Sequence, residues 1–303
     1  MPEVTRWQQF WADFALLAVT FIWGVTFVVV KDALEAIGPY YFLAIRFFLA
    51  ALFLVVIHPR FLAGITRGDL LAGAVIGLAL FSGYAFQTVG LQYTAASNAG
   101  FITGLSVVLV PVFAAVFSRR LPPGLVLAGV VSATAGLALL SLRDGLRMSY
   151  GDALIFCCAV SFAAHILLVG RFAPRHSSYT LAVLQIALVG LLSLGVAPWV
   201  ETFPPRLAPE VILALAATAI PATSLAFLIQ TRAQKFTSPT HTAIIFTMEP
   251  VFAGAAAWLW GGESFSAQQI LGGAAIVAGM LAAVLQPLLS LPSLRNSKAG
   301  AGR

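Results

Sequence analysis

The sequence has little charge. Of its 303 residues only 9% are charged, whereas 60% are hydrophobic and the mean hydropathy is +0.96. A soluble domain carries about 25% charged residues, and its surface needs them. The composition therefore excludes an ordinary soluble protein and predicts that lipid surrounds most of the chain.

Cysteines and catalytic motifs are also scarce. The two cysteines, Cys157 and Cys158, are adjacent inside one apolar run, where neither a structural disulfide nor a metal-binding spacing is expected. The sequence contains no Walker A motif, no HExxH and no GxSG, so no ATP motor or common hydrolase site is predicted. We expect no enzyme activity, no cofactor and no metal, although an intramembrane enzyme, a channel or a receptor stays open as an alternative.

The net charge is positive, at +6 with a pI near 9.7. The basic residues stand singly or in pairs between apolar runs, which indicates membrane topology rather than nucleic-acid binding. Lys and Arg are about three times as frequent in the predicted loops on the side of the N-terminus as on the other side. This bias predicts a multi-pass protein of the cell (inner) membrane with both termini in the cytoplasm.

Ten apolar runs follow one another, each bounded by charge, proline or glycine. Each is about 17 to 23 residues long, which as a helix spans a hydrocarbon core of roughly 30 Å. The sequence therefore predicts an all-α membrane protein with ten transmembrane helices. The runs cover residues 14–30, 40–57, 70–90, 95–117, 124–142, 152–170, 179–199, 210–231, 240–260 and 267–289.

The two halves of the chain resemble each other at nearly constant offsets, which indicates a duplication. Five helices per half is an odd number, so the second half must enter the membrane from the opposite side. Such inverted-topology repeats favour alternating access. We assign residues 1–145 to the first repeat, 146–290 to the second and 291–303 to a cytoplasmic tail. The matched pairs are Trp23 with Phe162 and Arg46 with Gln185 at an offset of 139, and Gln87 with Gln230, Thr94 with Thr237, Gly129 with Gly272 and Gly136 with Gly279 at 143.

Several motifs stand in an order that resembles the drug/metabolite transporter superfamily, specifically the EamA-type ten-helix transporter. They are Trp23-Gly24, Arg46 and the segment from Thr94 to Ala99 in the first repeat, and Phe236-Thr237-Ser238-Pro239, Met248-Glu249-Pro250-Val251-Phe252 and Gly261-Gly262-Glu263 in the second. The resemblance implies a secondary transporter with EamA-like repeats. Members of the family differ in substrate, so the substrate does not carry over, and we expect export of amino acids or related metabolites. One departure is Arg120, which stands where the second repeat has Glu263. The expected partners are a small-molecule substrate and the lipid bilayer, with no nucleic acid, and the oligomeric state stays open.

Ionisable residues inside spans are candidates for function because they are costly to bury. Arg46 could bind a substrate carboxylate; alternatively it pairs with Glu249 or with helix-end carbonyls. Glu249 directly precedes Pro250, which breaks or kinks a helix, and is the candidate for coupling; alternatively it is a structural acid. Pro111 and Pro250 are predicted hinges, and Pro221 a predicted kink.

Polar and aromatic residues inside apolar runs are candidates for lining a solute pocket. The alternative for each is interhelical hydrogen bonding or packing. His165 and His241 can donate hydrogen bonds to a substrate, and Tyr84 and Gln87 share one helix face. The predicted substrate-binding residues are Trp23, Thr26, Arg46, Tyr84, Gln87, Asn98, His165 and His241.

Overall fold

The computed structural model describes residues 4–94, 99, 102–119, 121–141, 149–261 and 266–289, and the regular structure in them is helical. The first half contains α1 (Arg6–Ala33), α2 (Pro39–Ile57), the 3-10 helix η1 (Pro59–Gly64), α3 (Arg67–Gly90), α5 (Ser106–Ser118) and α6 (Gly124–Ser141). The second half contains α7 (Tyr150–Phe172), the 3-10 helix η2 (Ala173–Arg175), α8 (Ser178–Val200), α9 (Pro209–Ala219), the π-helical η3 (Ile220–Leu225), α10 (Ala226–Ala233), α11 (Pro239–Phe246), α12 (Glu249–Gly261) and α13 (Ala267–Leu289).

Most of these helices are suited to a bilayer. Among the residues that the structure describes, seven helical segments are long and apolar enough to cross it, and Ile102–Phe117 and Gly124–Leu139 are shorter apolar helices. The outward faces carry exposed apolar side chains, such as Phe117 at 83% and Trp199 at 87% exposure, which suit lipid rather than water. The prediction of an all-α membrane protein with about ten helices is confirmed.

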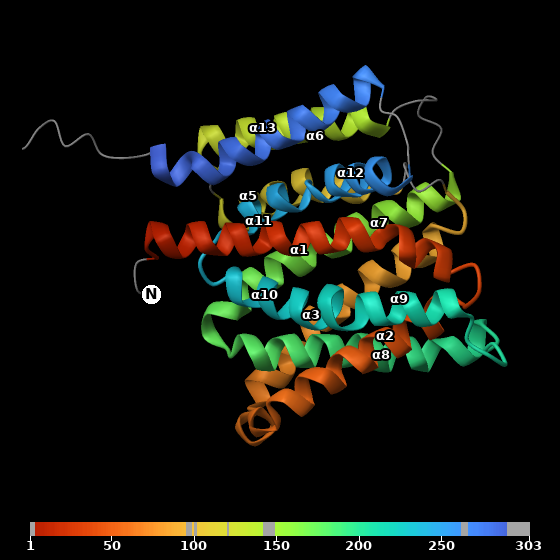
Figure 1. Cartoon of the computed structure of the whole chain (residues 1–303). Helices are drawn as coiled ribbons and strands as arrows, with labels where there is room; N and C mark the ends of the chain where they lie inside the picture. Colours follow the sequence, from red (N-terminus) through yellow and green to blue (C-terminus); the bar gives the residue numbers. More distant parts are fainter. Residues whose placement is uncertain are drawn as a thin grey trace, which may run out of the picture.

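The helices run back and forth, so that the bundle has two ends. The start of α1 and the end of α13 lie at the same end (Figure 1). We term this the near end, and the end where α1 finishes and α2 begins the far end.

The span predicted over residues 240–260 is broken. It consists of α11 and α12, and the break falls at Thr247 and Met248, directly before Glu249. Pro250 is the second residue of α12, a position where its missing N–H costs no helical hydrogen bond. The predicted break is confirmed. Pro111, the matching proline of the first half, does not stand at the start of a helix. It lies inside α5, which begins at Ser106.

The span predicted over residues 210–231 is interrupted in another way. Between α9 and α10 the chain forms the π-helical turn η3, which begins at Ile220 and contains Pro221. Proline lacks an N–H and crowds the preceding turn, and a widened π turn relieves this conflict. The kink predicted from Pro221 therefore takes the form of a π turn.

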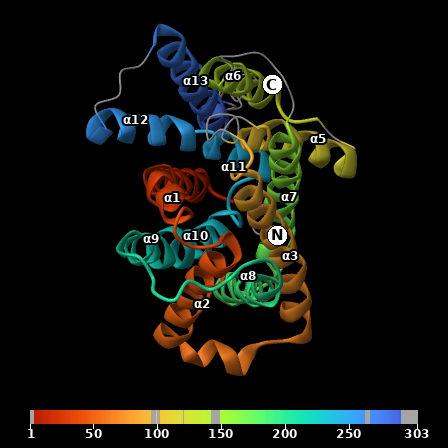
Figure 2. The same cartoon turned by 90° about the vertical axis from the view of Figure 1, so that its right-hand side faces the viewer.

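Helices α6 and α13 pack together at one side of the bundle (Figures 1 and 2). Their contact is reciprocal: a Cβ on Gly129 would lie 2.7 Å from the carbonyl oxygen of Gly279, and a Cβ on Gly279 would lie 2.6 Å from that of Gly129. Ser132 Oγ donates to the carbonyl of Ala275 at 2.8 Å. Glycine thus lets the two backbones touch.

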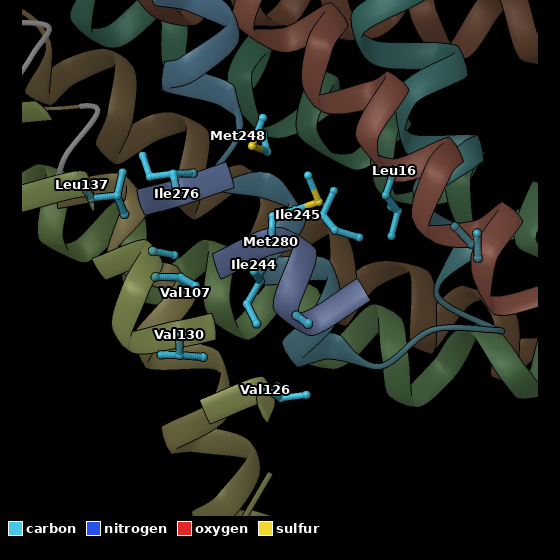
Figure 3. Packing of buried hydrophobic residues seen from close by; sticks show 14 residues of the cluster. Leu16, Val107, Val126, Val130, Leu137, Ile244, Ile245, Met248, Ile276 and Met280 are labelled. Atoms are coloured by element: carbon cyan, nitrogen blue, oxygen red, sulfur yellow. The ribbon is translucent and has the colours of Figure 1, made fainter. Parts of the chain in front are cut away.

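The other helices also pack in matching pairs. Helix α2 packs on α8, α3 packs on α7, and α9 and α10 pack on α1. One buried apolar cluster joins α1, α6, α11 and α13 around residues such as Leu16, Ile245 and Met280 (Figure 3). A second lies around Phe47 and Phe227.

Candidate functional site

Aromatic rings from both halves meet in the second apolar cluster. Tyr84 lies 5.5 Å from Phe162, Trp23 lies 5.6 Å from Phe227, and Tyr84 and Phe227 lie 6.3 Å apart, measured between ring centroids. The structure therefore brings the predicted residues Trp23 and Tyr84 into one group, which we term the central cluster. Its members are Trp23 (α1), Phe47 (α2), Tyr84 (α3), Phe162 (α7), Phe227 (α10) and Phe246 (α11).

Arg46 of α2 is a buried cation beside the central cluster. Its side chain is 5% exposed, and the guanidinium carbon lies 5.5 Å from the ring centroid of Tyr84. Nε donates to Thr223 Oγ1 at 2.7 Å and Nη2 to the Ala222 carbonyl at 3.4 Å. Within the described residues no carboxylate pairs with it, so the alternative pairing with Glu249 is not observed, whereas the bond to the Ala222 carbonyl, at the interruption between α9 and α10, agrees with the alternative of helix-end carbonyls. Guanidinium has five N–H groups, and these two hydrogen bonds use two of them.

The acceptors around Arg46 come from the π turn η3. The Ala222 carbonyl also accepts a hydrogen bond from Nε1 of Trp23, at 2.8 Å. A π turn frequently marks a functional site, because it presents backbone carbonyls that an α-helix would keep in its own ladder. Ala222 and Thr223 were not among the predicted site residues. The available signal was Pro221, which locates a kink but not the groups it presents.

His165 of α7 lies in a buried network. Its Nε2 is 2.7 Å from Oε1 of Gln185, and Gln185 Nε2 donates to Thr231 Oγ1 at 3.1 Å. His165 is 3% exposed and its ring lies edge-on to Phe227 at 5.9 Å. These contacts agree with the packing alternative for His165. Gln185, the counterpart of Arg46, belongs to this network rather than to a charged site.

Glu249 stands at the helix break. Its side chain is half-buried, and among the residues described its carboxylate forms no hydrogen bond or ion pair. A Cβ on Gly24 of α1 would lie 2.8 Å from the backbone carbonyl oxygen of Glu249, so α1 presses against the break.

Three further predicted residues have separate positions. Thr26 Oγ1 donates to the Ile22 carbonyl of its own helix at 2.8 Å. Gln87 is half-buried, and its side chain has no hydrogen-bond partner in the described part of the chain. Asn98 lies outside the described residues. Thr26 therefore serves its own helix, while the Gln87 amide stays available to a ligand.

His241 lies at the near end, at the start of α11. Its Nδ1 is 3.2 Å from Gln9 Nε2 and 3.7 Å from Asp13 Oδ2. Thr237 Oγ1 donates to Asp13 Oδ1 at 2.5 Å. Gln9, His241 and Ser238 also line a pocket of about 550 Å³. Asp13 and Thr237 were not predicted as site residues, since Asp13 directly precedes the first apolar run.

The arrangement as a whole places a buried cation, Arg46, against the packed aromatic rings of the central cluster. Across the described ranges, no group of three or more His, Cys, Asp or Glu side chains could hold a metal ion. In chemical terms, a guanidinium beside aromatic rings can pair with an anion and contact an apolar group.

Known proteins are similar to this chain over most of its length. The model of the EamA-like transporter family matches residues 10–142 and again residues 149–285. An uncharacterized transporter of Archaeoglobus fulgidus is 38% identical over 252 residues, which cover 81% of this chain and 77% of that protein. A second uncharacterized transporter of the same organism is 28% identical over 279 residues, covering 88% and 94%. One protein of known crystal structure has the same fold, with a TM-score of 0.77 at 19% identity and coverage of 91% of this chain and 98% of that one.

Proposed function

The chain belongs to the EamA-like transporter family, and we propose that it is a secondary transporter which moves small organic carboxylates across the membrane by alternating access. As a member of this family it is a multi-pass membrane transporter and not an enzyme. Amino acids or related metabolites are the proposed substrates, and export is the proposed direction. The observation that carries the proposal is Arg46, a buried cation without a carboxylate partner in the described residues.

A buried guanidinium is costly unless an anion or several acceptors compensate its charge. Arg46 donates to the Thr223 hydroxyl and the Ala222 carbonyl and lies over the Phe47 and Tyr84 rings, so its described neighbours are neutral and none is a counter-ion. A substrate carboxylate would bind the planar fork in two-point geometry. The rings of Tyr84 and Trp23 would then contact the apolar part of the same solute, so we propose an amphipathic acid.

Alternating access is supported by the way equivalent residues meet. Ser132 and Ala275 stand at the same position of the two halves, at the offset of 143, and are hydrogen bonded to each other. Tyr84 and Phe227 are likewise equivalent and lie ring to ring. A residue can contact its own counterpart only near a two-fold axis. This supports inverted repeats over residues 1–145 and 146–290. Termini on the cytoplasmic side of the inner membrane are proposed on a different ground, the bias of Lys and Arg between the loops.

Glu249 is the proposed coupling residue. It stands where α11 ends and α12 begins, and its carboxylate lacks a fixed partner among the described residues. Backbone breaks in a transporter line the solute pathway, where a carboxylate can exchange a proton with either side. Thr26, Gln87, Asn98, His165 and His241 stay proposed as further substrate contacts, although in this structure Thr26 donates to its own helix and His165 is held by Gln185.

Counterflow in proteoliposomes tests the carrier and its carboxylate together. We expect labelled phenylalanine to accumulate faster when unlabelled phenylalanine is on the far side, and phenylalaninamide, which lacks the carboxylate, to give no acceleration. Arg46→Gln should abolish counterflow of the acid, while Arg46→Lys retains part of it. Screening amino acids, nucleosides and cationic drugs by thermal shift would identify other acids. Counterflow restricted to solutes without a carboxylate contradicts the substrate class, and uptake without acceleration indicates a channel.

Coupling is tested by one further variant. Glu249→Gln keeps the shape of the side chain but cannot release a proton. We expect exchange to continue in this variant while the pH dependence of net transport disappears. Net transport that still follows the proton gradient in Glu249→Gln would remove Glu249 from the coupling role.

A further inference from the structure

Two hydrogen bonds repeat each other at opposite ends of the bundle. At the near end Thr237 Oγ1 donates to Asp13 Oδ1, and at the far end Thr94 Oγ1 donates to Asp152 Oδ1, both at 2.5 Å. Asp13 and Asp152 are 139 positions apart, the offset that relates Trp23 to Phe162. Thr94 and Thr237 are 143 apart, so all four residues are equivalent in pairs.

Each of these bonds joins one half to the other. Asp13 lies in α1 of the first half, and Thr237 lies in the second half, just before α11. Asp152 lies in α7 of the second half, whereas Thr94 lies in the first half, after α3. Every bond thus ties the first helix of one repeat to the segment that enters the fourth span of the other repeat.

The aspartates that accept these two bonds are buried. The exposed fractions of Asp13 and Asp152 are 2% and 4%, and Thr237 is 8% exposed. A hydroxyl that donates to a buried carboxylate forms a short, charge-assisted bond in a low-dielectric environment. Moving α1 away from Thr237, or α7 away from Thr94, requires one of these bonds to break.

We propose that the two Asp–Thr bonds are the latches of the transport pathway, one closing the near end and the other the far end. The inference rests on the proposed alternating-access function, in which one end opens while the other stays closed. Breaking the Asp13–Thr237 latch favours the state open at the near end. Breaking the Asp152–Thr94 latch favours the state open at the far end. Because each end is closed by a bond of the same kind, the two open states stay comparable in free energy, as a carrier that cycles between them requires.

The aspartates themselves are unequal in their other contacts. Asp152 Oδ2 also accepts from the backbone N–H of Ser149 at 2.8 Å, as part of a helix capping box. Asp13 Oδ2 accepts no hydrogen bond from the described residues and faces His241. Replacing Asp152 would therefore damage a helix cap as well as a latch. The threonines are the clean sites for a test, because Thr→Val removes the hydroxyl and keeps the shape.

Matched reporters exist one turn inside each latch. Leu16 in α1 and Ile155 in α7 are equivalent at the offset of 139, and both are 0% exposed. Each follows its aspartate by three positions. A cysteine at either position, in a background of Cys157→Ser and Cys158→Ala, reports opening of its own end by its rate of alkylation with a water-soluble maleimide.

We expect opposite responses from the two latches. Thr237→Val should raise the alkylation rate of Leu16→Cys by about tenfold and lower that of Ile155→Cys, since one bond to a charged group shifts a two-state equilibrium by roughly this factor. Thr94→Val should do the reverse. Thr237→Ser and Thr94→Ser keep the hydroxyl and should label as the parent does. Changes of the same sign at both reporters, or no change, overturn the proposal. No substrate is used, so failure of the proposed carboxylate specificity leaves this result readable.

Discussion

At the contact between α6 and α13, the most closely packed positions are equivalent in the two halves and carry the same residue, glycine. In the central cluster, equivalent positions carry different residues. In the contact, glycine meets glycine across the two halves, as Gly129 meets Gly279 and Gly136 meets Gly272. In the central cluster the counterparts differ: Tyr84 faces Phe227, and Trp23 occupies the position that Phe162 has in the other half. Arg46 and Gln185, beside the cluster, differ most.

The difference follows from what each region has to do. A packing layer between two equivalent repeats works best when both halves present the same surface, because any change must fit in two places. A solute has no two-fold symmetry, so a site that grips one end of it by charge and the other by apolar contact must differ between the halves. Equivalent residues that are the same in both halves therefore mark the packing layer between the repeats, and equivalent residues that differ mark the proposed binding site.

The largest effect is expected where the symmetric contact is tightest. A Cβ on Gly136 would lie 2.5 Å from the Gly272 carbonyl oxygen, with no flexible side chain to yield. Gly136→Ala should therefore lower the free energy of unfolding by about 3 kcal/mol, measured as a fall in the melting temperature in detergent. Gly273→Ala on α13 is the control, because its Cβ meets nothing within 4 Å. Equal stability of the two variants would contradict the close packing.

The next largest effect is a difference in stability between variants of Arg46 and of its counterpart Gln185. Gln185→Leu would leave His165 Nε2 without its partner in a buried site and remove the bond to Thr231 Oγ1, which still donates to the Phe227 carbonyl, so we expect a loss of about 2 kcal/mol in stability. Arg46→Gln removes a buried charge that has no described counter-ion, and should leave the melting temperature equal or higher. Addition of the carboxylate ligand should stabilise Gln185→Leu but not Arg46→Gln. Ligand stabilisation of Arg46→Gln at the parent level would show that the asymmetry is not used for binding.

The spans and the break before Glu249 were predictable from sequence, because apolar length and proline are local signals. The groups around Arg46 were not, since Ala222 and Thr223 come from a π turn whose partners lie far away in the chain. Asp13 and Asp152 were missed for another reason. Each lies at the edge of an apolar run and looked like a boundary, although their spacing of 139 is the same as that of Trp23 and Phe162.

A smaller effect is expected from making Trp23 like its counterpart. Trp23→Phe retains a ring beside Phe227 but loses the hydrogen bond from Nε1 to the Ala222 carbonyl. We expect a loss of about 1 kcal/mol in stability and a weaker counterflow signal, because the π turn loses one of its anchors. Trp199→Phe, at a position 87% exposed, should change neither quantity. Equal behaviour of both variants would leave the indole without a role in the site.

The smallest effect is expected at a side-chain pair that lies outside both the α6–α13 contact and the central cluster. At the near end Asp69, in the capping box that begins α3, pairs with Nδ1 of His176 at 2.7 Å. The start of α9, which occupies the matching place in the second half, has no side-chain cap. His176→Gln should cost only about 0.5 kcal/mol, because the pair is partly exposed and Asp69 keeps its bonds from Thr66, at 2.9 Å from the backbone N–H and 2.6 Å from the hydroxyl. A double-mutant cycle with Asp69→Asn isolates this coupling. Counterflow should be unchanged, because the pair belongs neither to the α6–α13 contact nor to the central cluster. A change in counterflow without a change in stability would place His176 in the solute pathway.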